Sequence, residues 1–118
     1  MNSVKPAVFV PAVVLLWTLA ASRTEPPRRI EISAKRFTYD PDLLTLKKGQ
    51  PVVLVMRSSD VAHGLKVDEL NIKSDEIKKG QETVIQFTPN ETGHYVGQCA
   101  HFCGAGHGSM KLQIEVVP

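Results

Sequence analysis

Near its C-terminus the chain reads Lys111-Leu-Gln-Ile-Glu-Val-Val117, a stretch in which apolar and polar residues alternate. Strict alternation is typical of a strand with one face against a core and the other in water. Upstream, the run Val52-Val-Leu-Val-Met56 is apolar throughout, as expected of a strand that is covered on both faces. Both segments predict strands, and together they favour an all-β fold.

Short apolar runs separated by turn residues continue over the chain beyond residue 30. Pro, Gly and Asn stand where the chain would reverse, as in Asp40-Pro-Asp42, Lys48-Gly-Gln50 and residues 89–93. The pattern predicts seven strands, over residues 30–34, 43–47, 51–58, 64–67, 83–88, 94–99 and 111–117. This arrangement fits a Greek-key β-sandwich or barrel. For residues 68–79 the sequence leaves a short helix and an irregular excursion equally open.

The first 22 residues have the pattern of an export segment. Residues 7–21 carry no charge and form an apolar run of 15 residues, whereas signal peptides have about 7–15 and spanning helices about 18–20. We expect a signal peptide at residues 1–22, or an uncleaved anchor that holds the chain to a membrane through residues 7–21. A polar linker at 23–29 and one domain at 30–118 would follow. The domain is then exported, to the periplasm or the outer face of the cytoplasmic membrane.

The charge balance identifies no partner. The 118-residue chain has a formal net charge of +2, without a long single-sign run or a basic stripe with interleaved aromatic residues. Such a stripe is typical of nucleic-acid interfaces. We therefore predict no nucleic-acid partner.

The segment before the last predicted strand concentrates soft metal donors. Thiolate and thioether favour copper, and imidazole suits both of its oxidation states. Five donors are one more than a tetrahedral site uses, and they are enough for two metal ions that share thiolates. The spacing therefore suggests a dinuclear copper centre. The donors are Cys99, Cys103, His107 and Met110 in one short stretch, and His63 in the upstream segment Asp60-Val-Ala-His-Gly64.

This motif resembles the CuA domain of cytochrome c oxidase subunit II, and that of nitrous oxide reductase, in the cupredoxin superfamily. The shared features are Cys-x3-Cys-x3-His-x2-Met, the preceding Gly93-His-Tyr-Val-Gly-Gln98, the strand that follows, and Asp-Val-x-His at Asp60 to His63. The resemblance covers residues 30–117. It implies a cupredoxin-like fold that binds two copper ions and transfers electrons.

The resemblance also implies redox partners for the chain and a role for each ligand. A redox protein such as a cytochrome c would donate the electron, and a terminal oxidase catalytic subunit would be a partner if the chain joins such a complex. We expect no independent catalysis. By the resemblance Cys99 and Cys103 would bridge the two ions, His63 and His107 would each bind one, Met110 would be a weak axial ligand, and His101 would offer its backbone carbonyl.

Three departures from the oxidase family bear on this prediction. One short apolar stretch precedes the domain where the family has two transmembrane helices, and His101 stands where the family has Glu. The family's aromatic cluster for receiving electrons is missing, since the only tryptophan, Trp17, lies in the leader. These departures favour a small stand-alone or singly anchored electron carrier. For the His101 imidazole we expect exposure or outer hydrogen bonds, with copper ligation open.

Other interpretations of the same residues stay open. Cys99 and Cys103 could form a disulfide, as is common in exported domains. A mononuclear blue-copper site would use His63, Cys103, His107 and Met110. A copper carrier would instead hold Cu(I) on the same soft donors for delivery.

Small residues in the ligand segment predict an exposed ligand and a docking surface. Gly104, Ala105, Gly106 and Gly108 allow close backbone approach and would leave the edge of the His107 ring near solvent. We expect an apolar docking patch for a redox partner around that ring, made of Ala62, Leu65 and Phe102.

Overall fold

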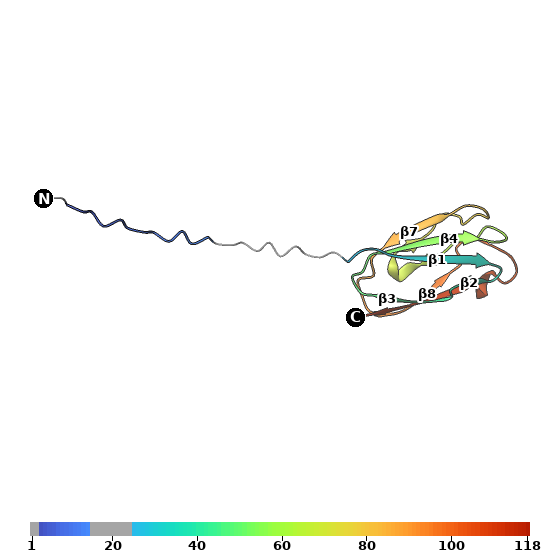
Figure 1. Cartoon of the computed structure of the whole chain (residues 1–118). Helices are drawn as coiled ribbons and strands as arrows, with labels where there is room; N and C mark the ends of the chain where they lie inside the picture. Colours follow the sequence, from blue (N-terminus) through green and yellow to red (C-terminus); the bar gives the residue numbers. More distant parts are fainter. Residues whose placement is uncertain (1–2, 15–24) are drawn as a thin grey trace.

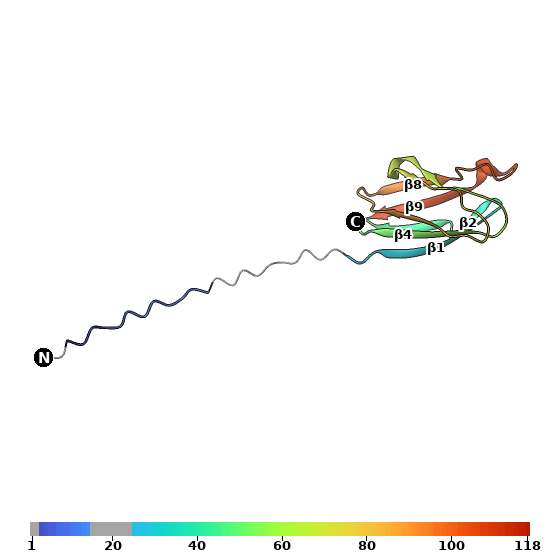
Figure 2. The same ribbon diagram turned by 90° about the horizontal axis from the view of Figure 1, so that it is seen from above.

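The computed structural model describes residues 3–14 and 25–118. Within these residues the regular structure is entirely strand apart from two 3-10 turns, η1 (Asp68–Leu70) and η2 (His107–Ser109). Figures 1 and 2 show the strands as two facing layers. The predicted all-β sandwich is therefore confirmed.

The first sheet has β4 (Val52–Ser58) in its interior, between β1 (Arg28–Lys35) and β7 (Thr83–Phe87), with β2 (Thr38–Asp40) beyond β1. β1 runs parallel to β4 and β7 runs antiparallel to it. Leu54, Val55 and Met56 of β4 are all fully buried. The continuous apolar sequence of β4 is thus explained, because both faces of this strand are covered.

The second sheet has the order β3 (Leu43–Lys47), β9 (Lys111–Val117), β8 (Gly93–Gln98), β5 (Lys66–Val67) and β6 (Ile72–Lys73). β9 runs parallel to β3 and antiparallel to β8. Leu112, Ile114 and Val116 are buried and their neighbours along β9 are mostly exposed, which confirms the predicted alternation. Most consecutive strands lie in different sheets, as in Greek-key sandwiches.

One aliphatic core fills the space between the sheets. Full burial of such a side chain contributes about 1.5–3 kcal/mol to stability. Cys99, Cys103 and Met110 belong to this same cluster, so three of the predicted metal donors are built into one end of the core. Its main aliphatic members are Ile32, Leu44, Leu46, Leu54, Met56, Leu65, Val67, Ile77, Leu112 and Ile114.

Three connections meet at one end of the sandwich. They are the β1–β2 turn at residues 36–37, the β4–β5 loop at residues 59–65 and the β8–β9 loop at residues 99–110. In Figures 1 and 2 this end lies opposite the C-terminus and the point where β1 begins. We call it the copper end, because all predicted ligands lie in its loops.

The seven predicted strands are confirmed with shifts of at most two residues at their ends. β1 begins at Arg28 instead of residue 30, because Arg28 and Arg29 pair with Val52 and Val53 of β4; the predicted linker at 23–29 therefore ends in strand. β2 and β6 are not predicted by the sequence. Residues 68–79 contain η1, β6 and irregular backbone.

Part of the predicted export segment lies outside the described residues. Residues 3–14 have no regular secondary structure and are exposed, and residues 1–2 and 15–22 are among those not described. In the described part of the chain no helix has the length and apolar character needed to cross a bilayer. A signal peptide or anchor at residues 1–22 stays a prediction.

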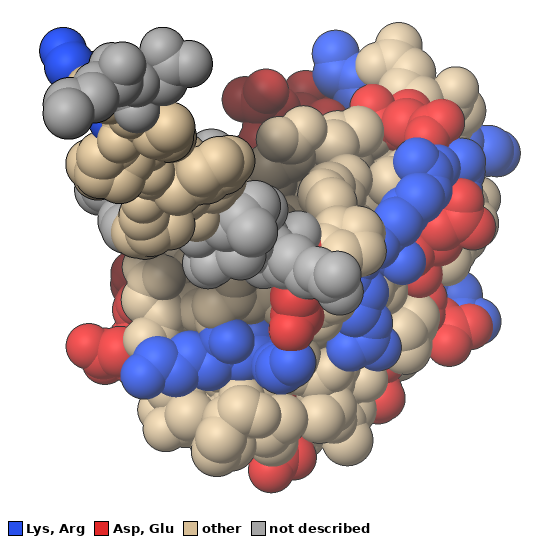
Figure 3. Space-filling view, turned by 60° about the vertical axis from the view of Figure 1, so that its left-hand side comes forward, with Lys and Arg blue, Asp and Glu red and all other residues tan. Residues whose placement is uncertain are grey.

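Charged side chains of both signs are mixed on the surface. On the face drawn in Figure 3, bands of Lys and Arg are bordered by Asp and Glu. Arg57 on β4 lies 3.5 Å from Glu31 and 3.2 Å from Glu82. Exposed pairs of this kind contribute about 0–1 kcal/mol each, so the apolar core stabilises the fold far more than the surface charges do.

Candidate metal centre

The backbone of each ligand loop is fixed by hydrogen bonds at the copper end. The Cys99 N–H donates to the Met110 carbonyl at 3.3 Å, which closes the β8–β9 loop at its base. His63 pairs with Ile77 in both directions, at 3.1 and 2.8 Å. Each ligand loop is thus fixed at its own base, and the two loops meet where His63 Nδ1 approaches Cys99 Sγ.

The donor atoms form a compact series of neighbouring pairs, which we call the donor row. His63 Nδ1 lies 4.0 Å from Cys99 Sγ, the two Sγ atoms are 3.7 Å apart, and Cys103 Sγ lies 3.7 Å from His107 Nδ1. Met110 Sδ lies 3.9 Å from Cys103 Sγ. The predicted donors are therefore together, with one imidazole at each end of the row and the two sulfurs of cysteine in its middle.

The thiols are in a state that can bind metal. Cys99 and Cys103 are both free and buried, and their separation of 3.7 Å is far beyond a disulfide bond of about 2.05 Å. The ligand atoms of His63, Cys99 and Cys103 all lie within 4.8 Å of one another. Since this set combines soft sulfur with imidazole, its chemistry fits copper.

Asp60 orients the first imidazole. Its Oδ1 lies 2.7 Å from His63 Nε2, so Nδ1 of the same ring is directed at Cys99. Burial of Asp60 opposes ionisation, but hydrogen bonds from the Arg36 N–H, from His63 and from the Val61 N–H outweigh it and hold the pKa of this carboxyl well below its usual range. A carboxylate that fixes the ring and tautomer of a ligand histidine is a common support for metal sites.

Burial also raises the pKa of two groups in and beside the site, Cys103 and Tyr39. It raises the pKa of the Cys103 thiol to about 11, aided by the neighbouring Cys99. Burial, followed by the two cysteines, raises the pKa of Tyr39 as well, whose hydroxyl donates to the Gly64 carbonyl at 2.5 Å. The Cys103 thiol thus stays protonated at neutral pH without metal, whereas a coordinated thiol loses its proton.

His101 directs its backbone and its side chain to different places. Its carbonyl oxygen lies 3.0 Å from Cys99 Sγ. Its Nε2 lies 3.5 Å from Glu76 Oε1, in a pair that is nearly half exposed on both sides. The imidazole therefore makes an outer contact with the segment that also holds His63 through Ile77.

The predicted docking patch is only partly present. Phe102 is 74% exposed and its ring centroid lies 5.7 Å from that of half-buried His107. Ala62 is half-buried beside it, in a hollow of about 290 Å³ that also includes Phe102, Val61 and Arg36. The inclusion of Leu65 was wrong, because this side chain is fully buried in the core.

The sequence predicts no role for two residues that lie at the site, Arg36 and Phe37 in the β1–β2 turn. Arg36 Nε donates to the Cys103 carbonyl at 3.0 Å. A Cβ atom on Gly106 would lie only 2.4 Å from the Phe37 ring, and one on Gly104 would lie 3.1 Å from it. The glycines in the sequence indicate that the backbone of this loop is approached closely. The structure confirms this at Gly104 and Gly106, where the approaching group is the Phe37 ring.

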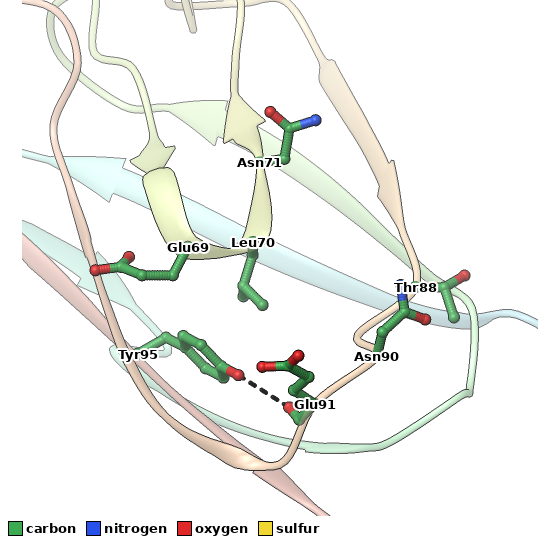
Figure 4. A pocket seen from close by; sticks show the side chains of 7 residues that line it. All are labelled: Glu69, Leu70, Asn71, Thr88, Asn90, Glu91 and Tyr95. Atoms are coloured by element: carbon green, nitrogen blue, oxygen red, sulfur yellow. Dashed lines mark hydrogen bonds between the residues drawn. The ribbon is translucent and has the colours of Figure 1, made fainter.

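A second hollow, also of about 290 Å³, lies away from these loops, between η1 and the connection from β7 to β8. In Figure 4 the Tyr95 hydroxyl points at Glu91, and it donates to the Glu91 carbonyl at 3.0 Å. None of its lining residues is Cys, His or Met, so it offers no soft donor. The lining residues are Glu69, Leu70, Asn71, Thr88, Asn90, Glu91 and Tyr95.

Comparison with known families now places the chain. The family model described as a cupredoxin-like domain matches residues 8–110. The chain belongs to the cupredoxin-like family. The matched residues include β1 to β8, the ligand loop between β8 and β9, and the upstream His63.

This cupredoxin-like chain is 39% identical over 74 residues to a probable cytochrome c oxidase subunit 2 of Streptomyces avermitilis. That alignment covers 63% of the chain and 23% of the relative, so the chain spans about a quarter of the length of the curated relatives it matches.

Two solved structures extend the comparison. A chain of a heme-copper terminal oxidase dimer is 25% identical, with a TM-score of 0.68 over 76% of this chain and 65% of that one. The metal binding domain of the Cu(I) exporting P-type ATPase CopA of Streptococcus pneumoniae, solved with Cu(I), is 27% identical, with a TM-score of 0.64 over 82% of this chain and 92% of that one.

Proposed function

We propose that this chain is an electron-transfer module with a dinuclear copper centre of the CuA type. The observation that carries the proposal is the row of donors, in which each neighbouring pair is 3.7–4.0 Å apart. Two thiolates in the middle of the donor row can be shared by two ions. The imidazole at each end can then add to the coordination of one ion. A single tetrahedral ion needs only four donors around one point and would leave part of this set unused.

The ligand roles follow from position in the row. Cys99 and Cys103 would bridge, His63 and His107 would each bind one ion, and Met110 and the His101 carbonyl would be weaker ligands. Bound copper would supply a one-electron redox couple. The oxidase subunit 2 named above, 39% identical over the aligned 74 residues, supports this assignment.

The protein's contribution is to hold these donors still. His63, Cys99, Cys103 and Met110 are buried at 0–5% exposure, and His63 is fixed both by Asp60 and by its backbone pairing with Ile77. Ligands set on a packed scaffold change position little when an electron arrives or leaves. The arrangement therefore favours fast transfer at a small driving force.

The surroundings of His107 suggest where electrons enter or leave. This ligand is half-buried, and Phe102 beside it is exposed. A redox partner such as a cytochrome c would dock over Phe102, Val61 and Ala62. The match to the terminal oxidase chain supports a terminal oxidase catalytic subunit as the other partner. This chain would then act in the periplasm or on the outer face of the membrane.

The test is to reduce the thiols of the purified chain, load copper, and analyse the metal before and after repeated cycles of oxidation and reduction. We expect two ions per chain, both retained. Cys99→Ser should bind at most one, whereas His94→Ala, at an exposed histidine outside the site, should bind two. One ion in the unmodified chain would contradict the proposal and support a mononuclear blue-copper site.

Delivery of Cu(I) is the second candidate function, because the CopA domain solved with Cu(I) is 27% identical over 82% of the chain. The fully buried, doubly fixed His63 disfavours it, since delivery requires ligands that exchange readily at a surface. A Cu(I) chelator separates the two: rapid removal of reduced copper supports delivery, and retention supports electron transfer.

A further inference from the structure

The β1–β2 turn touches both ligand loops through one residue. The Arg36 backbone N–H donates to Asp60 Oδ2 at 2.7 Å, and Asp60 Oδ1 lies 2.7 Å from His63 Nε2. Arg36 Nε donates to the Cys103 carbonyl at 3.0 Å. Arg36 is thus linked through Asp60 to the ligand at one end of the donor row and directly to a cysteine in its middle.

The next residue adds a packing contact to the same loop. The Phe37 ring lies so close to the backbone of Gly104 and Gly106 that a Cβ atom at either position would be within 3.1 Å of it. The β1–β2 turn therefore supports the β8–β9 loop in two ways, by a hydrogen bond to Cys103 and by an aromatic ring under the glycines that follow.

The guanidinium also places a positive charge beside the centre. Arginine stays charged at every working pH, and among the described residues no carboxylate forms an ion pair with the Arg36 side chain. Reduction of copper held by these donors would add one electron, and thus one negative charge, to the site, and a nearby cation would stabilise that charge.

We propose that Arg36 is a positioning residue that fixes the two copper loops relative to each other and favours the reduced form of the centre. The effect on the reduced form rests on the proposed function; the effect on the loops does not. Loss of the side chain should loosen residues 99–110 and lower the reduction potential.

The experiment compares Arg36→Met with Lys35→Met in the full chain. Lys35 is the exposed last residue of β1, so Lys35→Met removes the same charge from the adjacent position and leaves the hydrogen bonds of Arg36 in place. The first measurement is amide hydrogen exchange of residues 99–110 in the metal-free, reduced chain. Arg36→Met should exchange faster in this loop, and Lys35→Met should exchange as the unmodified chain does.

The second measurement is the reduction potential after copper loading. Arg36→Met should lower it more than Lys35→Met does, and Arg36→Lys, which keeps the charge and loses the Nε donor, should keep most of the potential while exchange is fast. If Arg36→Met does not fold, Arg36→Lys carries the exchange comparison. Equal exchange and equal potential for the Met variants at positions 35 and 36 would overturn the proposal. Failure of the unmodified chain to bind copper would overturn the proposed function and leave the exchange result to decide the positioning role.

Discussion

The contact between Phe37 and the ligand loop can be tested with a single methyl group. Gly106 has φ −89° and ψ 11°, which alanine adopts without strain, so the cost of Gly106→Ala comes from space alone. Its Cβ would lie 2.4 and 2.5 Å from two atoms of the Phe37 ring. Forcing an extra methyl into a packed site typically costs about 1–3 kcal/mol.

Gly108→Ala is the matched control, because a Cβ atom there has no neighbour within 4 Å. Both changes restrict the unfolded chain equally, by about 0.4–1 kcal/mol in favour of the folded state, so the difference between the two variants isolates the clash. Chemical unfolding of the metal-free, reduced chain should give a difference of about 1–3 kcal/mol, and a Tm difference of about 4–8 °C per kcal/mol is expected for a domain of this size.

Removal of the ring completes the test. In Phe37→Ala with Gly106→Ala, the methyl group has room, so the double variant should be more stable than the sum of the single changes allows, with a coupling of about 0.5–3 kcal/mol. Equal stability of Gly106→Ala and Gly108→Ala, or strict additivity with Phe37→Ala, would refute the contact between the β1–β2 turn and the ligand loop.

Three further changes address individual residues. Asp60→Asn removes the carboxylate 2.7 Å from His63 Nε2 and should weaken copper binding by about 10–100-fold in a competition titration; unchanged affinity would contradict its orienting role. Met110→Leu keeps the volume of a fully buried side chain and should cost less than about 1.5 kcal/mol, yet it should change the optical spectrum of the copper-loaded chain, and an identical spectrum would exclude Met110 as a ligand. Tyr39→Phe deprives the Gly64 carbonyl of its donor and should cost about 1–3 kcal/mol in urea unfolding; no measurable loss would show that another donor replaces it.

The sequence predicts those parts of the fold that repeat a pattern. The alternation in β9 and the apolar run in β4 are long enough to indicate strands, whereas β2 and β6, with three and two residues, are too short to show a period. The donor set is predictable because His107 and Met110 follow Cys103 at short fixed spacings. The hydrogen bonds that support the donor set are not predictable, since Arg36 reaches Asp60 across 24 residues and Cys103 across 67.

Leu65 shows why a loop residue next to a ligand can be misplaced. The sequence puts it beside His63 and suggests a surface position, but its side chain turns inward to fill the space above Gly97, where a Cβ atom would lie 2.9 Å from Leu65 Cδ1. Only the packing of β5 against β8 settles this direction. The partner of the His101 imidazole, Glu76, likewise depends on a segment whose course the sequence left open.

The central claim is that two copper ions share the thiolates of Cys99 and Cys103. Electron paramagnetic resonance of the copper-loaded, partly oxidised chain tests it most directly. We predict one unpaired electron with hyperfine coupling to two copper nuclei, and this coupling should be lost in Cys99→Ser. Coupling to a single nucleus in the unmodified chain would contradict the dinuclear centre.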